Sequence, residues 1–163
     1  MTATYDAIAT TTLSTDQTDV EFTSISQNYT DLILVREGAQ TAGNNSVIQV
    51  GNGSYDTGSN YSGTQLFGTG STAASDRFSN DTRWFANYAN GTNRTISIYQ
   101  FMNYSNTTTN KTMLARNNDA SYYTSAYVFL WRSTSAINRI KISQGSNGLK
   151  SGTTFTLYGI KAE

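Results

Sequence analysis

Apolar and polar residues alternate along many short stretches of this chain, which is the pattern of half-buried β-strands. Val20 and Phe22 flank Glu21, and Ile140 and Ile142 flank Lys141. Clusters of Gly, Asn, Ser and Asp separate these stretches, as turns do, and no segment shows a strong helical period. The pattern predicts strands at residues 5–12, 20–25, 32–37, 47–50, 65–68, 83–89, 95–104, 112–116, 126–132, 137–143 and 154–162.

Two of these stretches have no polar alternate. Residues 32–35 read Leu-Ile-Leu-Val, and residues 128–131 read Val-Phe-Leu-Trp. A strand that is apolar on both faces must be covered on both, either by a second sheet and a loop or by another subunit. We therefore expect one domain over residues 1–163, an antiparallel two-sheet β-sandwich of jelly-roll type with about 8–11 strands. We also expect it to form an oligomer.

Glycine is concentrated between residues 51 and 82, where six of the 13 glycines lie. We read this region as long Gly/Ser/Asn-rich loops around one short strand, and loops of a sandwich commonly carry variable contacts. The pairs Gly51-x-Gly53 and Gly68-x-Gly70 complete no phosphate-binding motif, because neither is followed by the Walker lysine or by a helix. They are read as tight turns.

The composition removes several kinds of chemistry. The chain contains no His, no Cys and no Pro, so it has no Ser-His-Asp site, no thiolate nucleophile and no Cys/His zinc site. Lys plus Arg and Asp plus Glu number 11 each, and Thr, Ser and Asn together make up 61 of the 163 residues. A neutral surface of hydroxyl and amide groups is a poor ligand for nucleic acid. We predict no cofactor, no metal and no nucleic-acid partner.

No stretch approaches the roughly 18 apolar residues of a membrane span, and residues 1–6 lack the basic and apolar regions of a signal peptide. We therefore expect no membrane insertion and synthesis in a cytoplasm. Close carboxylates occur at Asp16 and Asp19 and at Asp76 and Asp81. A glycosidase needs two carboxylates about 5 to 9.5 Å apart, but turn chemistry is the commoner role of such Asp residues, and we predict a non-enzyme.

Tyrosine gives the strongest hint of a binding surface. Several tyrosines lie in or beside polar segments, where exposed rings serve as contacts for proteins or as stacking platforms for sugars. The tryptophans Trp84 and Trp131 fall inside predicted strands and are expected in the core or in a subunit interface, not in a ligand site. The candidate contact residues are Tyr55, Tyr61, Tyr104, Tyr122 and Tyr123.

Five segments together resemble a known group of proteins. Residues 5–13, 29–35, 101–112, 130–140 and 151–160 are similar to small all-β virion proteins of tailed bacteriophages, including cyanophages. The resemblance runs nearly end to end and contains no catalytic signature. It implies a jelly-roll-like sandwich, most often a homotrimer, on the outer surface of the particle, made in the host bacterial cytoplasm.

Related sandwiches serve either as capsid decoration (cement) proteins or as domains of tail and head fibres. Because no fibre shaft or attachment segment is evident, we favour a decoration protein that binds the major capsid protein or another virion protein. A receptor-binding module stays open, with residues 51–75 and Tyr122–Tyr123 recognising a host surface glycan or protein. A glycan-cleaving enzyme using Asp76 and Asp81 is a more remote alternative.

Overall fold

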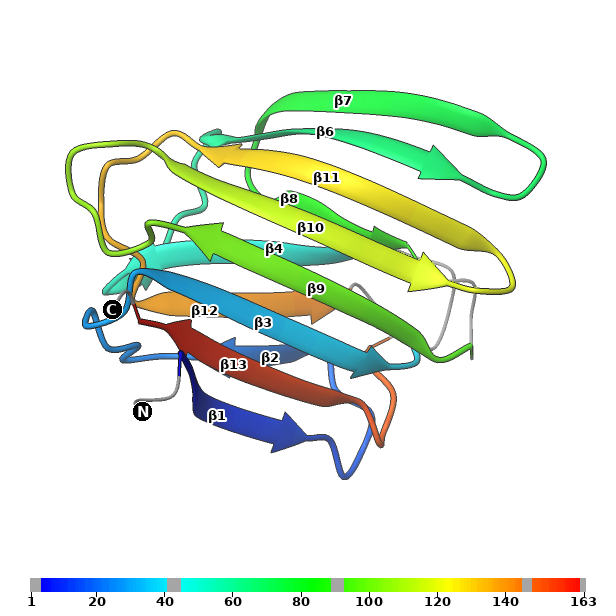
Figure 1. Ribbon diagram of the computed structural model, residues 1–163, viewed down its shortest axis with the longest axis horizontal. Coiled ribbons are helices and arrows are strands. Elements are labelled where there is room, and N and C mark those ends of the chain that lie inside the picture. The colour runs from blue at the N-terminus through cyan, green and yellow to red at the C-terminus, as the bar shows by residue number, and fades with distance from the viewer. Residues whose placement is uncertain (1–3, 41–44, 89–92, 145–147, 162–163) are drawn as a thin grey trace.

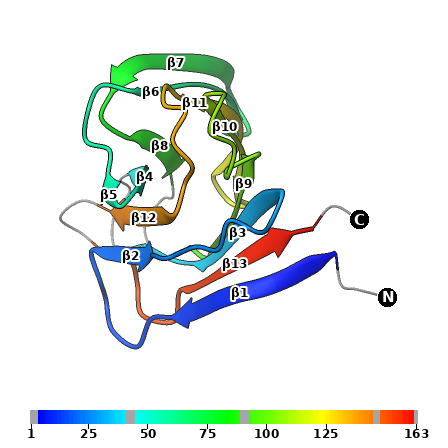
Figure 2. The ribbon, with the colours of Figure 1, turned by 90° about the vertical axis from the view of Figure 1, so that its left-hand side faces the viewer.

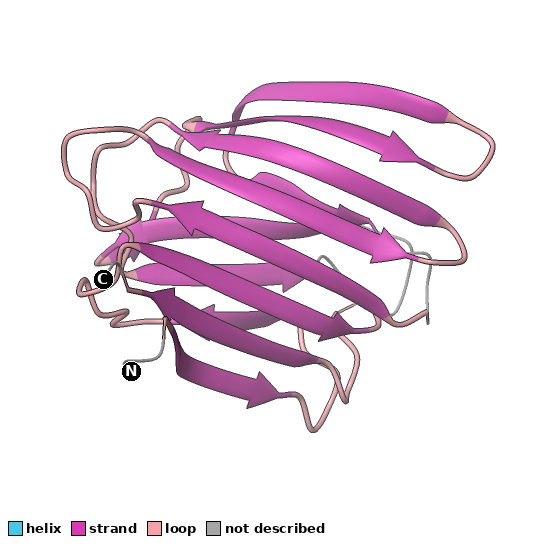
Figure 3. Cartoon of the chain, in the orientation of Figure 1, coloured by secondary structure: helices cyan, strands magenta, loops and turns pink. Residues whose placement is uncertain are grey.

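The computed structural model describes residues 4–40, 45–88, 93–144 and 148–161. These residues form thirteen strands and no helix, arranged as two stacked antiparallel sheets (Figures 1 and 3). The predicted all-β, two-sheet, jelly-roll-like sandwich is confirmed. The expected number of strands was too low, because two strands that lack an apolar alternation were missed.

The larger sheet has eight strands in the order β1-β13-β3-β9-β10-β11-β6-β7. All its pairs are antiparallel, and the register shifts only between Ala7 and Ala9 and between Tyr61 and Gly63. Its strands are β1 (Tyr5–Thr12), β13 (Thr154–Ile160), β3 (Asp31–Gly38), β9 (Thr95–Met102), β10 (Lys111–Asp119), β11 (Tyr123–Trp131), β6 (Tyr61–Gly68) and β7 (Ala73–Asp81).

The smaller sheet has the order β2-β12-β4-β5, with β8 also paired to β4. Figure 2 shows the larger sheet running from β7 past β9 to β1, with the smaller sheet on one side of it. One face of each sheet therefore points inward and the other points away from the sandwich. The strands are β2 (Asp19–Phe22), β12 (Arg139–Gln144), β4 (Asn45–Asn52), β5 (Ser54–Tyr55) and β8 (Trp84–Tyr88).

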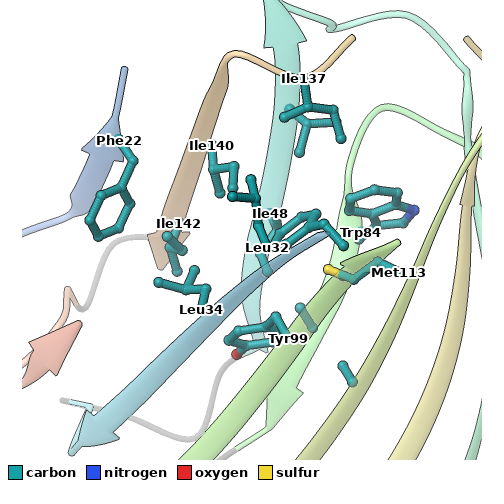
Figure 4. Packing of buried hydrophobic residues seen from close by; sticks show 14 of the residues in the cluster. Phe22, Leu32, Leu34, Ile48, Trp84, Tyr99, Met113, Ile137, Ile140 and Ile142 are labelled. Atoms are coloured by element: carbon teal, nitrogen blue, oxygen red, sulfur yellow. The ribbon is translucent and has the colours of Figure 1, made fainter. Parts of the chain in front are cut away.

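The core fills the space between the two inner faces. Every second residue of β9, β10 and β11 is buried there, as the two-residue period of a strand requires. Trp84 of β8 lies at the centre and is fully buried, near Met113 and Leu32 (Figure 4). Its indole N–H donates to the carbonyl of Leu130 at 3.2 Å. Trp84 and Trp131 are both core residues, as the sequence predicted.

The region read as long loops, residues 51–82, is mostly strand. It contains the end of β4, then β5, β6 and β7. The β7 strand was missed because almost all its side chains are exposed on both faces, with only Phe78 and Asp81 partly covered. Backbone pairing to β6 holds it, and such pairing leaves no trace in the pattern of apolar residues.

Gly63 of β6 shows that a glycine in this region can serve packing and not a turn. A Cβ atom there would lie 2.5 Å from Cδ1 of Phe129 and 2.7 Å from Cζ of Phe78. Both rings belong to the packed interior around β6, β7 and β11, so neither can move away at little cost. The glycine therefore lets two aromatic rings approach the backbone of β6.

We expect Gly63→Ala to lower the free energy of unfolding by about 1–3 kcal/mol, because overpacking forces the rings off their positions. Gly68→Ala is the matched control on the same strand, since its nearest neighbour would be the carbonyl oxygen of Thr72 at 3.7 Å. Urea unfolding of the two variants measures the difference. Equal stability of the two variants would show that the rings of Phe78 and Phe129 can move aside at little cost in free energy.

Candidate functional site

The outer face of the larger sheet carries a continuous group of apolar side chains. The residues of β6, β9, β10 and β11 that alternate with the core residues all point to this face. Strand pairing places Leu114 opposite Val128, and Ala126 opposite Leu66. We call this surface the outer apolar face; its members are Leu66, Ile96, Ile98, Leu114, Ala126, Val128 and Leu130.

Exposure sets this face apart from the rest of the surface. Seven large hydrophobic side chains are exposed among the described residues, and five of them lie on the outer apolar face. Leu66 is 65% exposed, Val128 48% and Leu114 45%. Single exposed apolar residues are ordinary, but a contiguous group marks a surface for binding protein or ligand.

The face is hollowed between its ridges. A hollow of about 630 Å³ extends from Leu66 on β6 to Ile96 and Ile98 on β9. Small or short side chains of the two strands between, including Ala126 and Thr124, also line it. A second hollow of about 300 Å³ lies beside it, between Ile98, Leu114 and Ala126. A binding partner could therefore contact both the exposed side chains and the hollows between them.

Charge is scarce on this face. Arg116 of β10 is the one charged residue among the outward positions of β6, β9, β10 and β11, and it borders the larger hollow. The outer face of the smaller sheet is different, since Lys141 of β12 pairs across the ladder with Glu21 of β2. The middle of the larger sheet's outer face is thus nearly free of charge, and charged residues lie at its borders, where Glu37 of β3 pairs opposite Ile96 and Arg77 of β7 lies beside Val128.

The two runs without polar alternates account for part of this face. The structure buries Phe129 and Trp131 in the core and turns Val128 and Leu130 outward. In the same way Leu32 and Leu34 point inward, while Ile33 and Val35 are half-buried on the outer side. No second sheet covers that outer side in the described chain. These two strands were expected to be covered on both faces. In the described chain only their inner faces are covered, by the smaller sheet.

Tyr55 does not present a free ring. Arg139 and Lys141 lie over its face, with Arg139 Cζ 5.2 Å and Lys141 Nζ 4.7 Å from the ring centre. Burial, together with the negative charge of Glu21, raises the pKa of Tyr55 to about 12. The ring stabilises two cations of the charged sheet face by cation–π contact.

Three other candidate tyrosines are buried, so the expectation that they are exposed was wrong. Tyr61 and Tyr104 are fully buried and Tyr123 nearly so. Their hydroxyl groups reach polar partners at the edge of the core: Tyr61 donates to carbonyl oxygens of Val50 and Asp56, and Tyr123 donates to Gln65. The Tyr104 hydroxyl donates to the carbonyl of Ser26. Polar neighbours in the sequence therefore do not show that a tyrosine is exposed, because a buried tyrosine whose hydroxyl is hydrogen-bonded can have the same neighbours.

Tyr122 is the candidate that remains accessible, at 37% exposure. Its ring stacks on Tyr123, which stacks in turn on Phe67, with ring centres 6.4 and 5.5 Å apart. It borders a hollow of about 480 Å³ formed by residues 68–70 and 118–124, at the tips of two hairpins. Asp119 and Ser121 supply polar groups there.

The carboxylates proposed for glycan cleavage do not form a pair. Asp76 and Asp81 are five residues apart on β7, which corresponds to roughly 15 Å along a strand and exceeds the separation that either hydrolytic geometry needs. Each accepts a hydrogen bond from the backbone N–H of the next residue, Arg77 or Thr82, at 2.7 Å. Both carboxylates therefore serve the local backbone as hydrogen-bond acceptors.

Neither a metal cluster nor a membrane helix is found in the part of the chain that the structure describes. No three residues of the types His, Cys, Asp and Glu come together there, and no helix is long and apolar enough to cross a membrane.

The sequence pointed to only part of the outer apolar face. The run at residues 128–131 predicted apolar residues on both faces of one strand. The alternation of Ile96 and Ile98 about Ser97 predicts that both isoleucines face the core, which was wrong, because the structure buries Ser97 and turns the isoleucines outward. Leu66 and Leu114 were missed as surface residues, because each is a single leucine within a strand and looks like a core position. Only the order of the strands brings β6, β11, β10 and β9 side by side.

Comparisons with known proteins find a similar arrangement of strands and no similar sequence. No protein-family model matches the chain, and no curated protein matches it. Caenorhabditis elegans galectin LEC-6 is 10% identical, with 98% of this chain and 96% of that one covered and a TM-score of 0.41. Xenopus laevis galectin-Va is 13% identical, with 88% and 98% covered and a TM-score of 0.43. A mutant of alginate lyase Aly36B is 11% identical, with 94% and 81% covered and a TM-score of 0.36. These low values transfer neither ligand nor reaction to this chain.

Asp56 ties the end of β11 to the segment before β6. Its carboxylate accepts hydrogen bonds from Trp131 Nε1 at 2.7 Å, Asn60 Nδ2 at 2.8 Å and Gly58 N at 2.8 Å. Burial acts to raise the pKa of Asp56, but the hydrogen bonds from Trp131, Asn60 and Gly58 outweigh it and hold that pKa below its ordinary value. The ionised form is therefore the stabilising one.

We expect Asp56→Asn to lower the free energy of unfolding at pH 7 by about 1–2 kcal/mol, since charge-assisted hydrogen bonds are lost. A carboxyl with a depressed pKa stabilises fully above its unfolded value near 3.9, and this contribution disappears as the pH falls through the folded pKa. The difference between wild type and variant should therefore shrink between pH 5 and pH 2. Urea unfolding across this range measures it, and a constant difference would contradict the assignment.

Proposed function

We propose that this chain is a non-enzymatic structural protein on the outer surface of a bacteriophage virion. In this proposal it is a capsid decoration protein that assembles as a homotrimer and binds the major capsid protein or another virion protein. The outer apolar face is its assembly surface, where it packs against neighbouring copies. The resemblance of five sequence segments to phage virion proteins supports the setting, and the geometry of the sheet supports the mode of assembly.

The observation that carries the proposal is the contrast between the two outer surfaces. Five of the exposed large apolar side chains lie on four adjacent strands whose outward positions include one charged residue, Arg116, as at the centre of a protein interface. Glu37, opposite Ile96, and Arg77, beside Val128, lie at the rim of this surface. Interfaces are depleted in charge at their centre, whereas an ordinary solvated sheet face is polar. The charged face of β2 and β12 has that ordinary character and faces solvent in the proposed assembly.

A trimer also suits the chemistry of this surface. Weakly charged contacts change little with salt, and three linked copies bind a repeated lattice with an avidity well above that of one copy. Decoration of a shell then needs only modest affinity at each site. No step of this function requires catalysis.

We expect the wild-type chain to be a trimer at micromolar concentration. Val128→Lys should raise the dissociation constant of the trimer at least tenfold, so that the variant becomes largely monomeric. The lysine places a charge in a desolvated contact, which costs several kcal/mol per trimer. Because Val128 is 48% exposed in the single chain, the variant should unfold within about 0.5 kcal/mol of wild type.

Light scattering coupled to gel filtration measures the assembly. Ser143→Lys is the matched control, because it adds the same charge to β12, opposite Asp19 on the charged sheet. It should remain a trimer. A monomeric wild type, or trimers of equal strength in both variants, would contradict the proposed assembly surface.

A second candidate function is recognition of a host surface glycan at the hairpin tips. The accessible ring of Tyr122 beside a polar hollow of about 480 Å³ favours it, since sugars stack on exposed aromatic rings and bond to carboxylate, hydroxyl and amide groups. This site lies at the end of the sheet, at the hairpin turns.

If this second function holds, the purified chain binds glycans from the host surface, and Tyr122→Ala weakens that binding at least tenfold. Tyr5→Ala is the control, because Tyr5 is also exposed, at 58%, and lies on the edge strand β1. Binding measured on immobilised host polysaccharide gives the answer. Absence of binding, or equal loss in both variants, removes glycan recognition at this tip.

A further inference from the structure

Arg36 is a positively charged side chain buried completely inside the sandwich. It lies on the inner face of β3 and has no exposed surface. Its guanidinium donates to Thr95 Oγ1 at 3.3 Å, to the Ala39 carbonyl at 3.4 Å and to Gln40 Oε1 at 3.4 Å. All three acceptors are neutral, and all three distances lie at the long end for a hydrogen bond.

No carboxylate balances this charge in the described chain. The ion pairs found there join Arg94 to Glu37, Lys150 to Asp16 and Lys161 to Asp6, all at the surface. Glu37 follows Arg36 directly, but it points to the opposite face of β3. Burial lowers the pKa of Arg36, although an arginine stays charged inside proteins. A buried charge normally has an ionic partner.

Two further buried polar side chains lie next to Arg36 on the inner face of β9. Strand pairing places Ser97 of β9 directly opposite Arg36, and Tyr99 follows two residues later on the same face. Arg36 Nε is buried and has no hydrogen-bond partner. The hydroxyl groups of Ser97 and Tyr99 are also buried, and they interact with each other but with no other hydrogen-bond partner. Figure 4 shows the Tyr99 hydroxyl pointing away from Trp84 and Met113. The guanidinium N–H can only donate, and both hydroxyls can donate.

Small side chains lie beside this position between the sheets. Ala115 lies opposite Tyr99 on β10 and is buried. Ala86 of β8 is also buried, and its backbone carbonyl accepts a hydrogen bond from Asn117 Nδ2 of β10 at 2.7 Å. Stacked sheets lie about 10 Å apart, and serine and alanine fill only a small part of that spacing. Arg36, Ser97 and Tyr99 are all fully buried, so a ligand that reaches them has to be small.

We propose that Arg36, Ser97 and Tyr99 hold a monovalent anion of chloride size between the two sheets. Water could accept from two of these donors, but it would leave the guanidinium charge unbalanced. A halide accepts from all three and neutralises the charge. A bound anion would join β3 to β9 from inside and stabilise the middle of the larger sheet.

The test measures thermal unfolding in sodium chloride and in sodium gluconate at constant ionic strength, because gluconate is too large for an enclosed site. For wild type, the unfolding temperature should rise by about 3 °C for each tenfold increase in chloride above the dissociation constant. Arg36→Met should abolish this dependence, whatever its own stability. Ser97→Ala, which removes one donor and little volume, should weaken it.

Arg116→Met is the control, since it removes an equal charge from the exposed face of β10 and should keep the full chloride dependence. Crystals grown in sodium bromide should show an anomalous scattering peak within hydrogen-bond distance of Arg36 Nε. An equal response to chloride and gluconate, an unchanged response in Ser97→Ala and Arg36→Met, or no bromide peak at Arg36 would overturn the proposal.

Discussion

The two-residue period of β10 and β11 governs both the core and the surface of this molecule. Each strand divides its side chains between an inner face, which the smaller sheet covers, and an outer face, which nothing in the described chain covers. In most half-buried strands the outer set is polar. Here that set includes the exposed side chains of Leu114, Val128 and Leu130, so the same alternation that builds the core also places large apolar side chains on the surface.

Charge follows the same division. The outer face of the smaller sheet holds Glu21, Arg139 and Lys141 around the ring of Tyr55, and that face is stable in water without a partner. The larger sheet has Arg116 alone among the outward positions of its four adjacent strands β6, β9, β10 and β11. Glu37 and Arg77 border these four strands on either side. In the proposed assembly, this apolar centre packs against protein and the charged face of the smaller sheet remains in solvent.

Periodicity in the sequence located most strands, because burial on one face imposes alternation on the residues. It failed for β7, which is held by backbone hydrogen bonds to β6 and buries little side-chain surface. It also misjudged Tyr61, Tyr104 and Tyr123, since the polar residues around them in the sequence are not the residues that surround them in space. The Arg36 cluster was out of reach for the same reason, because Ser97 comes next to Arg36 only through strand pairing.

The most direct test of the proposed assembly is cryo-electron microscopy of the virion to which we assign this protein, at a resolution that places side chains. The account predicts trimers over the outer surface of the capsid, with Leu114 and Val128 of each copy buried against a neighbouring copy. Density confined to the tail, or trimers that leave the outer apolar face of β6, β9, β10 and β11 open to solvent, would contradict it.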